Sequence, residues 1–153
     1  MGQEWNVMGS LKTMIDGIAT FKSVSIGFEA DLFQSKKFGG NLPAVFLEYR
    51  GNEEIGPQDS SFERYVPFTV MLVIVRKADS AKQNRSAKIE TAISDKNLIA
   101  NAIDANPQLS GQQVTVSPIA ATRVLEANVR VPAPFWAVEI DIPVAVWETK
   151  AGR

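Results

Sequence analysis

Glu139 and Asp141 are the two residues of this sequence whose types and spacing best suit shared chemistry. They alternate with apolar residues in the segment Phe135–Trp147, so on a strand both carboxylates point to one face, about 7 Å apart. Paired carboxylates can act as general acid and base or hold a divalent cation. No third acidic ligand lies nearby in the sequence, which favours a solvated strand face over a metal site.

Two further groups of residues resemble functional motifs but lack a necessary part, and a third group is charged without resembling a motif. The run Lys36–Gly40 has lysines beside two glycines but not the spacing of a phosphate loop, so it indicates a turn. The run Asp59–Ser61 offers hydroxyl groups without a base to activate them. Asp95, with Lys88 and Glu90, is interpreted as part of a polar helix face.

The 153 residues include no histidine and no cysteine, and these two absences exclude much of enzymology. Without imidazole there is no Ser-His-Asp triad, no histidine-bound zinc and no general base that titrates near neutrality in its unperturbed state. Without cysteine there are no disulfides, thiolate metal sites or thiol nucleophiles. The reactions and metal sites that depend on imidazole or a thiol are therefore excluded for this chain.

The net charge and the hydropathy of the chain do not predict binding to nucleic acids or to membranes. Sixteen basic residues against 17 acidic ones give a net charge of −1, which does not predict nucleic-acid binding through bulk charge. The longest apolar run, Val66–Val75, has about half the length of a membrane-spanning helix. The first ten residues lack the pattern of a secretory signal, so we expect synthesis in the cytoplasm and no contact with a membrane.

The three tryptophans suggest different roles. Trp136 is in phase with the valines and isoleucines of its segment and is predicted to be core, whereas Trp5 belongs to the apolar stripe of the first helix. Trp147 is on the opposite phase near the C-terminus, where an exposed tryptophan could anchor another protein.

The hydrophobic period predicts four elements in the first half of the chain. Apolar residues spaced three and four apart indicate a helix over Trp5–Thr20. A short strand follows at Val24–Phe28, and Pro43–Tyr49 is apolar on both faces, as in an interior strand. The strongest strand pattern covers Arg64–Lys77, where Pro67 predicts a local edge or a bulge because proline cannot donate to a ladder.

The second half predicts one helix and two strands. The helix should end near Asn106, because Pro107 disfavours helical geometry in the residue before it, and its broad apolar face comprises Ile89, Ile93, Leu98, Ile99, Ala102 and Ile103. A strand over Val114–Ala127 is expected to break at Pro118. The final strand covers Phe135–Trp147, where Pro143 again predicts an edge or a bulge.

Together these elements predict a single α+β domain over residues 1–153. It is a two-layer sandwich in which two helices pack on a mostly antiparallel sheet of about five strands, in the order α-β-β-β-α-β-β. Polar loops at 29–41 and 50–63 and a Pro-rich connection at 128–134 project from this scaffold, and such loops usually contact partners. The interior strands also need more cover than two helices supply, which self-assembly could provide.

Three segments carry a resemblance to a known family: L-P-A-V-F-L at Leu42–Leu47, Y-V-P-F-T-V-M-L-V-I-V-R-K at Tyr65–Lys77, and F-W-A-V-E-I-D-I-P-V-A-V-W-E at Phe135–Glu148. With the two helices, this pattern resembles small tail proteins of Mu-like phages. That group is placed with the tail terminators, which form a ring, typically a hexamer, that caps the tail tube. The segment Arg123–Phe135 matches nothing in the pattern.

The resemblance implies a structural virion protein at the junction of tail and head, which is not an enzyme and needs no cofactor or metal. Its partners are other copies of itself, the tail tube protein and a neck or head connector protein, and genomic DNA passes through the lumen without specific binding. The loop at 50–63 is the candidate for contact with the tube or the lumen, through the charged residues Arg50, Glu53, Glu54, Asp59, Glu63 and Arg64. Trp147 is the candidate interface anchor.

Two other functions remain open at this stage. A different structural role in the phage neck or in head completion fits a chain of this size equally well. A small metal- or ligand-binding domain that uses Glu139 and Asp141 is the alternative from another class.

Overall fold

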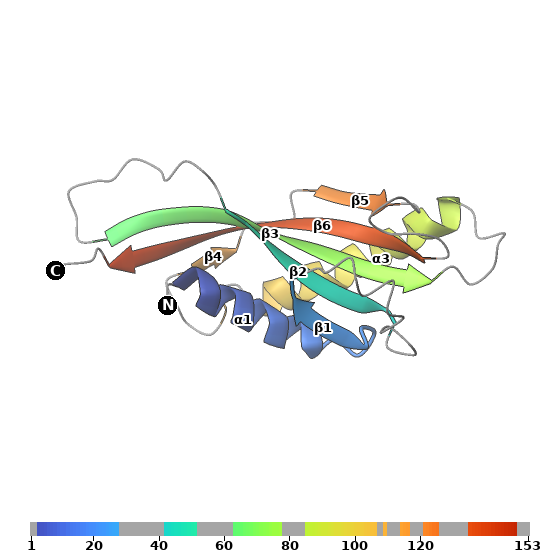
Figure 1. Ribbon diagram of the computed structural model, residues 1–153, viewed down its shortest axis with the longest axis horizontal. Helices are drawn as coiled ribbons and strands as arrows, with labels where there is room; N and C mark the ends of the chain where they lie inside the picture. The colour runs from blue at the N-terminus through green and yellow to red at the C-terminus, as the bar shows by residue number, and fades with distance from the viewer. Residues whose placement is uncertain are drawn as a thin grey trace.

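Two long strands, each of 15 residues, run through the whole structure. They are β3 (Glu63–Lys77) and β6 (Phe135–Thr149), and they pair antiparallel along their full length, from Glu63 opposite Thr149 to Lys77 opposite Phe135 (Figure 1). The alternation of apolar residues that predicted both strands continues from end to end. The computed structural model describes residues 3–27, 42–51, 63–77, 85–106, 109, 114–116, 121–125 and 135–149.

The other strands flank this central pair. On the β3 side lies β2 (Ala44–Gly51), antiparallel to β3, followed by β1 (Ser23–Ile26), which is parallel to β2. On the β6 side lie two short antiparallel strands, β5 (Ala121–Leu125) and β4 (Val114–Val116). The sheet therefore has six strands in the order β1-β2-β3-β6-β4, with β5 also paired to β6.

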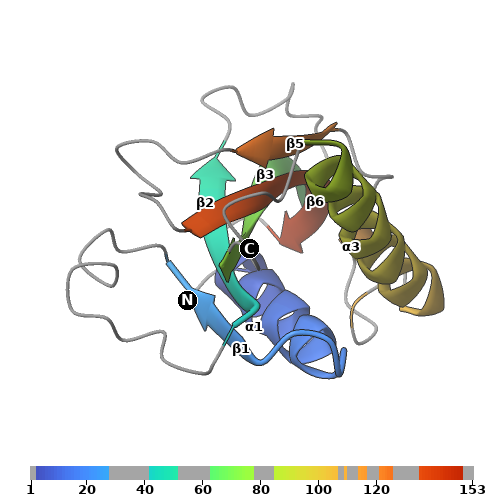
Figure 2. The same cartoon turned by 90° about the vertical axis from the view of Figure 1, so that its right-hand side faces the viewer.

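Both helices of the described residues cover the same face of this sheet. They are α1 (Gln3–Asp16) and α3 (Arg85–Ala105), and both contribute to one core with the sheet. In Figure 2, α1 lies below the strands and α3 to their right. This arrangement confirms the predicted α+β class, the two layers and the element order. The segment predicted as one strand with a break at Pro118 forms two strands, β4 and β5, on either side of that proline.

Pro67 and Pro143 lie where one side of their strand has no ladder partner in the described part of the sheet. The β2–β3 pairing ends at Gly51 opposite Phe68, one residue before Pro67 is reached. Pro143 falls between β5, whose pairing extends to Asp141, and β4, whose pairing begins at Val144. Both prolines thus avoid a position where a strand amide would be needed, and the predicted local edges are confirmed.

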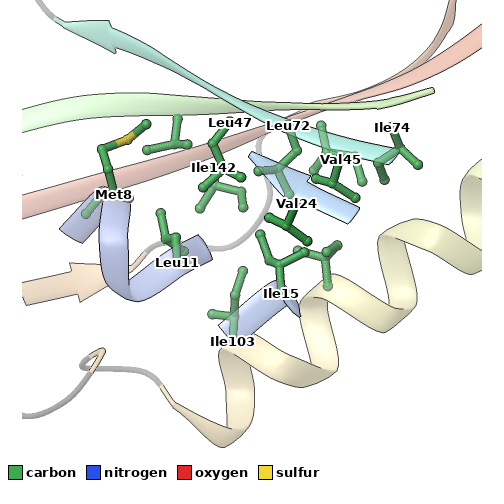
Figure 3. Packing of buried hydrophobic residues seen from close by; sticks show 14 of the residues in the cluster. Met8, Leu11, Ile15, Val24, Val45, Leu47, Leu72, Ile74, Ile103 and Ile142 are labelled. Carbon is green, nitrogen blue, oxygen red and sulfur yellow. The ribbon is translucent and has the colours of Figure 1, made fainter. Parts of the chain in front are cut away.

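The main core fills the space between the sheet and the helices. Figure 3 shows Val45, Leu47, Leu72, Ile74 and Ile142 of the sheet packed against a helical layer that contributes Met8, Leu11, Ile15 and Ile103. A second, smaller cluster lies on the opposite face of the sheet and contains Ala44, Phe46, Met71, Val73, Val75 and Ala137. As predicted, β2 is therefore buried on both faces over Ala44–Leu47.

The helices differ from the prediction in which residues they bury. In α1 the buried stripe starts at Val7 and Met8, while Trp5 is 50% exposed, and the helix ends at Asp16 rather than Thr20. In α3 the predicted end near Asn106 is correct, but Ile89 and Ile93 are 43% and 49% exposed. The buried stripe of α3 consists of Ala92, Asp95, Ile99 and Ile103, and Ile89 and Ile93 lie about 60° and 100° around the helix from Ala92, by the 3.6-residue turn.

Candidate interaction surface on the sheet

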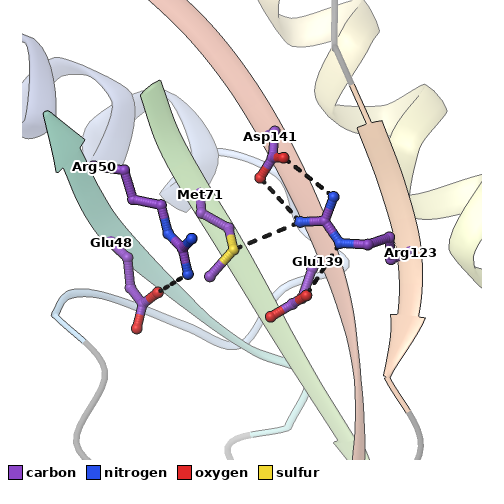
Figure 4. Close-up of polar contacts among 6 residues, drawn as sticks. All are labelled: Glu48, Arg50, Met71, Arg123, Glu139 and Asp141. Carbon is purple, nitrogen blue, oxygen red and sulfur yellow. Dashed lines mark hydrogen bonds and ion pairs between the residues drawn. The ribbon is translucent and has the colours of Figure 1, made fainter. Parts of the chain in front are cut away.

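The two carboxylates that the sequence singled out share one arginine. Arg123 of β5 lies opposite Glu139 of β6 in the ladder and extends across the sheet face that points away from the helices (Figure 4). Its Nε donates to Glu139 Oε1 at 3.2 Å, and its Nη1 and Nη2 donate to the two oxygens of Asp141, each at 3.1 Å. Its Nη2 also lies 3.8 Å from Met71 Sδ.

This arginine changes what the carboxylates can do. Hydrogen bonding to Asp141 is the main reason that the pKa of Arg123 is raised, with burial acting against it and Glu139 adding to it, so the guanidinium stays charged. The positive charge of Arg123 therefore compensates part of the negative charge of Glu139 and Asp141. Three of their four oxygens already accept hydrogen bonds from this arginine. In the ranges that the structure describes, no group of three or more acidic, histidine or cysteine residues could hold a metal ion.

A second charged pair lies on β2, which β3 separates from β6. Arg50 Nη2 is 3.6 Å from Glu48 Oε2 at the end of β2. Glu48 is opposite Met71, which in turn is opposite Asp141, so the ladder aligns the two charged pairs across three strands. We call the six residues drawn in Figure 4, Glu48, Arg50, Met71, Arg123, Glu139 and Asp141, the charged band.

The charged band is a mixed surface with three acids and two arginines. Arg50 and Arg123 are more than two fifths exposed, whereas the carboxylates are more covered. Of the predicted contact residues, Arg50 belongs to this band. Exposed arginines over partly covered carboxylates suit a protein interface, where arginine is enriched.

Glu63, Arg64 and Trp147, three other predicted contact residues, come together through the β3–β6 ladder. Arg64 is opposite Glu148, and Trp147 is opposite Tyr65. The five rungs from Glu63–Thr149 to Pro67–Ala145 extend beyond the last rung of β2 and form a projection, which we call the β3–β6 arm (Figure 1). The backbone therefore gathers these three residues at one end of the sheet, while their side chains lie outside the described part.

The remaining predicted contact residues, Glu53, Glu54 and Asp59, fall outside the described residues. The structure fixes the two ends of their segment, at Gly51 of β2 and Glu63 of β3. Gly51 lies opposite Phe68 at the base of the β3–β6 arm, and Glu63 is in the outermost rung of that arm.

Asp95 is a correction to the sequence analysis, which placed it on a polar helix face. Its side chain is 1% exposed and accepts two hydrogen bonds from Arg76, which closes β3. Burial raises the pKa of Asp95, and the hydrogen bonds and charge of Arg76 oppose that rise. The spacing of Asp95 from Ala92, Ile99 and Ile103 matches the buried stripe and could have indicated this position.

Sequence reasoning also missed a surface hollow of about 710 Å³ beside α1. Its lining includes Trp5, Gly9, Ser10 and Met14 of α1, with Asn106 and Leu109 beyond the end of α3. The exposed Trp5 is the signal that could have revealed it, because this tryptophan lies outside the buried stripe of its helix.

No helix in the described part of the chain is long and apolar enough to cross a membrane. Comparison with known proteins adds no relative: no family model matches the chain, and no curated protein matches it.

Proposed function

We propose that this chain is a structural assembly protein that forms a closed ring of about six copies on the end of a phage-like tail tube, as the resemblance to tail terminators implies. The observation that supports it best is the β3–β6 arm. The arm extends past β2, and on its β3 edge no strand of the described residues pairs with residues 63–67.

An arm of this kind suits assembly for a physical reason. Among the described strands, only β3 and β6 form the three outer rungs of the arm, since β4 pairs with β6 over Val144–Val146. Two-stranded ribbons are marginally stable alone in water, and an unpaired strand edge offers amide and carbonyl groups to another chain. Addition of a strand from a neighbouring copy or from a tube subunit would satisfy those groups. The fold also brings Arg64 and Trp147, which the sequence had marked for contact, to this arm.

The mechanism is geometric. Head-to-tail contacts between identical copies close into a ring when the rotation between neighbours allows it. One face of the ring covers the last layer of the tube and stops the addition of tube subunits, and the other face meets the head connector at the tail–head junction. Because the chain is nearly neutral, DNA can pass through the lumen without the strong binding that a basic channel gives.

The charged band favours this structural role over the metal-binding alternative. Arg123 contacts three of the four carboxylate oxygens of Glu139 and Asp141, so a cation entering there would have to displace a guanidinium. The same contacts stabilise the pairing of strand β5 with β6, which is a structural role.

A pair of charge reversals on β3 tests the role of the arm. Arg64→Glu changes the arm, whereas Lys77→Glu makes the same change of charge at the opposite end of the same strand. We expect Arg64→Glu to lower the yield of capped tubes at least tenfold while Lys77→Glu caps them normally, and both to keep the thermal stability of the parent. Equal capping by the two variants would contradict a role for the arm, and binding only to isolated connector would assign the chain to the neck instead.

A further inference from the structure

The open edge of the β3–β6 arm carries a defined set of backbone hydrogen-bonding groups. In β2 the carbonyl groups of Pro43 and Leu47 face β1, since they accept hydrogen bonds from the amides just before and just after that strand. The even-numbered residues of β2 therefore face β3, and their partners in the register are the odd-numbered residues of β3. Beyond the last rung of β2, the residues of β3 whose backbone groups point outward are Glu63, Tyr65 and Pro67.

Pro67 agrees with this alternation. Proline has no amide proton, so at an outward position it removes no hydrogen bond to β6, whereas at position 66 or 68 it would remove one. The open edge therefore has two donors, the amides of Glu63 and Tyr65, and three acceptors, the carbonyl groups of these residues and of Pro67. Among the described strands, none pairs with this edge.

This edge is complementary to itself. When a twofold axis perpendicular to the sheet relates two copies, their arms lie antiparallel, and Tyr65 can be placed opposite Tyr65 of the second copy. The two tyrosines then exchange two backbone hydrogen bonds, and the amide of each Glu63 donates to the carbonyl group of Pro67 in the other copy. All four outward donors of the two edges are used, and the helices of both copies cover the same face of the joined sheet.

The space beside the arm also has the length of one arm. Because β2 ends opposite Phe68, the positions beside residues 63–67 are open among the described strands (Figure 1). In the register centred on Tyr65, Glu63 of the second copy lies opposite Pro67, one rung short of the end of β2. A shift of two residues toward β2 would place that Glu63 opposite Thr69, which already pairs with Arg50.

The residue types favour the same register. A shift of one residue would place outward-facing backbone groups opposite inward-facing ones, and a shift of two residues away from β2 would place Arg64 opposite Arg64. Like charges directly opposite are unfavourable in a sheet, whereas aromatic pairs are favourable. In the register centred on Tyr65, Arg64 is opposite Val66, and Tyr65 shares its rung with Trp147. Four aromatic residues then form one row across the two arms.

We propose that the arms of two copies pair antiparallel about a twofold axis at Tyr65, so that free chains form a dimer with one continuous sheet. A twofold contact is isologous, and two copies satisfy it completely. The contact is small beside the roughly 800 Å² that each partner buries in a stable interface, so the dimer should dissociate on dilution. The inference goes beyond the proposed function, because the same edge must be released before it can contact a tube or a ring neighbour.

Cysteine cross-linking tests the register, since the natural chain has no cysteine. A disulfide needs Cα atoms within about 7 Å of each other. In the proposed dimer the two copies of position 65 are about 5.5 Å apart, whereas the two copies of position 64 are two residues out of register and about 8 Å apart. On mild oxidation we expect Tyr65→Cys to form a disulfide dimer, and Arg64→Cys to form at least tenfold less.

Two controls accompany this experiment. A mixture of Arg64→Cys and Val66→Cys chains, one of them carrying a tag that changes its mass, should form the mixed disulfide, because these positions are opposite. Lys77→Cys, an exposed position at the other end of β3, should cross-link no more than Arg64→Cys.

Removal of one outward amide gives a second measurement. Tyr65→Pro removes a donor that faces away from β6, as the natural Pro67 does, whereas Tyr65→Phe keeps both the amide and the aromatic ring. By light scattering over a range of concentrations, we expect Tyr65→Pro to weaken dimer formation at least tenfold and Tyr65→Phe to leave it within threefold. The cross-linking result does not depend on either variant.

The outcomes separate this dimer from the proposed ring. A parent chain that is monomeric at every concentration, equal disulfide yields from Tyr65→Cys and Arg64→Cys, or equal association of Tyr65→Pro and Tyr65→Phe would overturn the dimer. Capped tubes in that case would leave the ring standing. A dimer with the expected cross-links that never joins a tube would support the pairing of the arms and contradict the ring.

Discussion

Arg76 holds Asp95 with two hydrogen bonds, from Nη2 to Oδ1 at 2.6 Å and from Nε to Oδ2 at 3.1 Å. The pair joins the C-terminal end of the long strand β3 to the buried side of α3, so it links the sheet to the helical layer. A planar guanidinium suits this forked geometry, which an ammonium group cannot reproduce.

Removing only the arginine should destabilise the fold strongly. Arg76→Met leaves a buried carboxylate without its partner, which costs about 3 to 5 kcal/mol in such pairs, whereas Arg76→Met with Asp95→Leu should recover most of that loss. Urea unfolding of the two single variants and the double variant measures the coupling. A double variant that simply adds the two losses would contradict the pairing.

The contribution of Asp95 to the unfolding free energy should change with pH in one direction. Burial raises the pKa of Asp95 above its ordinary value of 3.8, so the folded chain holds this proton more tightly than the unfolded chain does. The stability from this group is fully present below about 3.8 and is lost as the pH rises through the raised value. We therefore expect the unfolding free energy of the parent, relative to Asp95→Asn, to increase as the pH falls from 7 to 4. A relative decrease would show that Arg76 outweighs burial.

Arg123 should contribute modestly to the stability of the fold, and its contacts should prevent divalent cations from binding at Glu139 and Asp141. Its side chain is 45% exposed, so Arg123→Gln should cost about 1 kcal/mol or less, and added salt should reduce the difference. Millimolar Ca²⁺ or Mg²⁺ should leave the Tm of the parent unchanged. A cation-dependent rise in the Tm of the parent would support a metal site at Glu139 and Asp141, since specific binding stabilises the folded state.

The acidic residues of the predicted contact loop give a prediction that concerns assembly alone. Glu53→Lys with Glu54→Lys should keep the Tm of the parent and lower the yield of capped tubes. Glu90→Lys with Asp104→Lys, two exposed acidic positions on α3, makes the matched change of charge elsewhere. Unchanged capping by the loop variant would remove these glutamates from the interface.

Strand patterns in this chain predicted the fold well because the physical rules behind them are local. A period of two marks β3 and β6 over their full length, and the missing amides of Pro67 and Pro143 show where the neighbouring strands stop. The division around Pro118 was predicted from the position of that proline, whereas the parallel pairing of β1 with β2 was not predicted.

The helices were harder to interpret, because a few apolar residues can outweigh the true period. Ile89 and Ile93 suggested one broad face for α3, while the buried stripe passes through a carboxylate. Asp95 can be buried only because Arg76, 19 residues earlier, reaches it at the end of β3. The role of Arg123 was hidden for the same reason, since its partners follow it by 16 and 18 residues and meet it only through the β5–β6 ladder.

The native mass of the chain tests the central claim most directly. Light scattering behind size exclusion, at low and high concentration and with purified tail tube, measures the number of copies. We expect about six times the 16.7 kDa of one chain, either in solution or only on the tube. A strict monomer of 16.7 kDa that ignores tubes would contradict the ring.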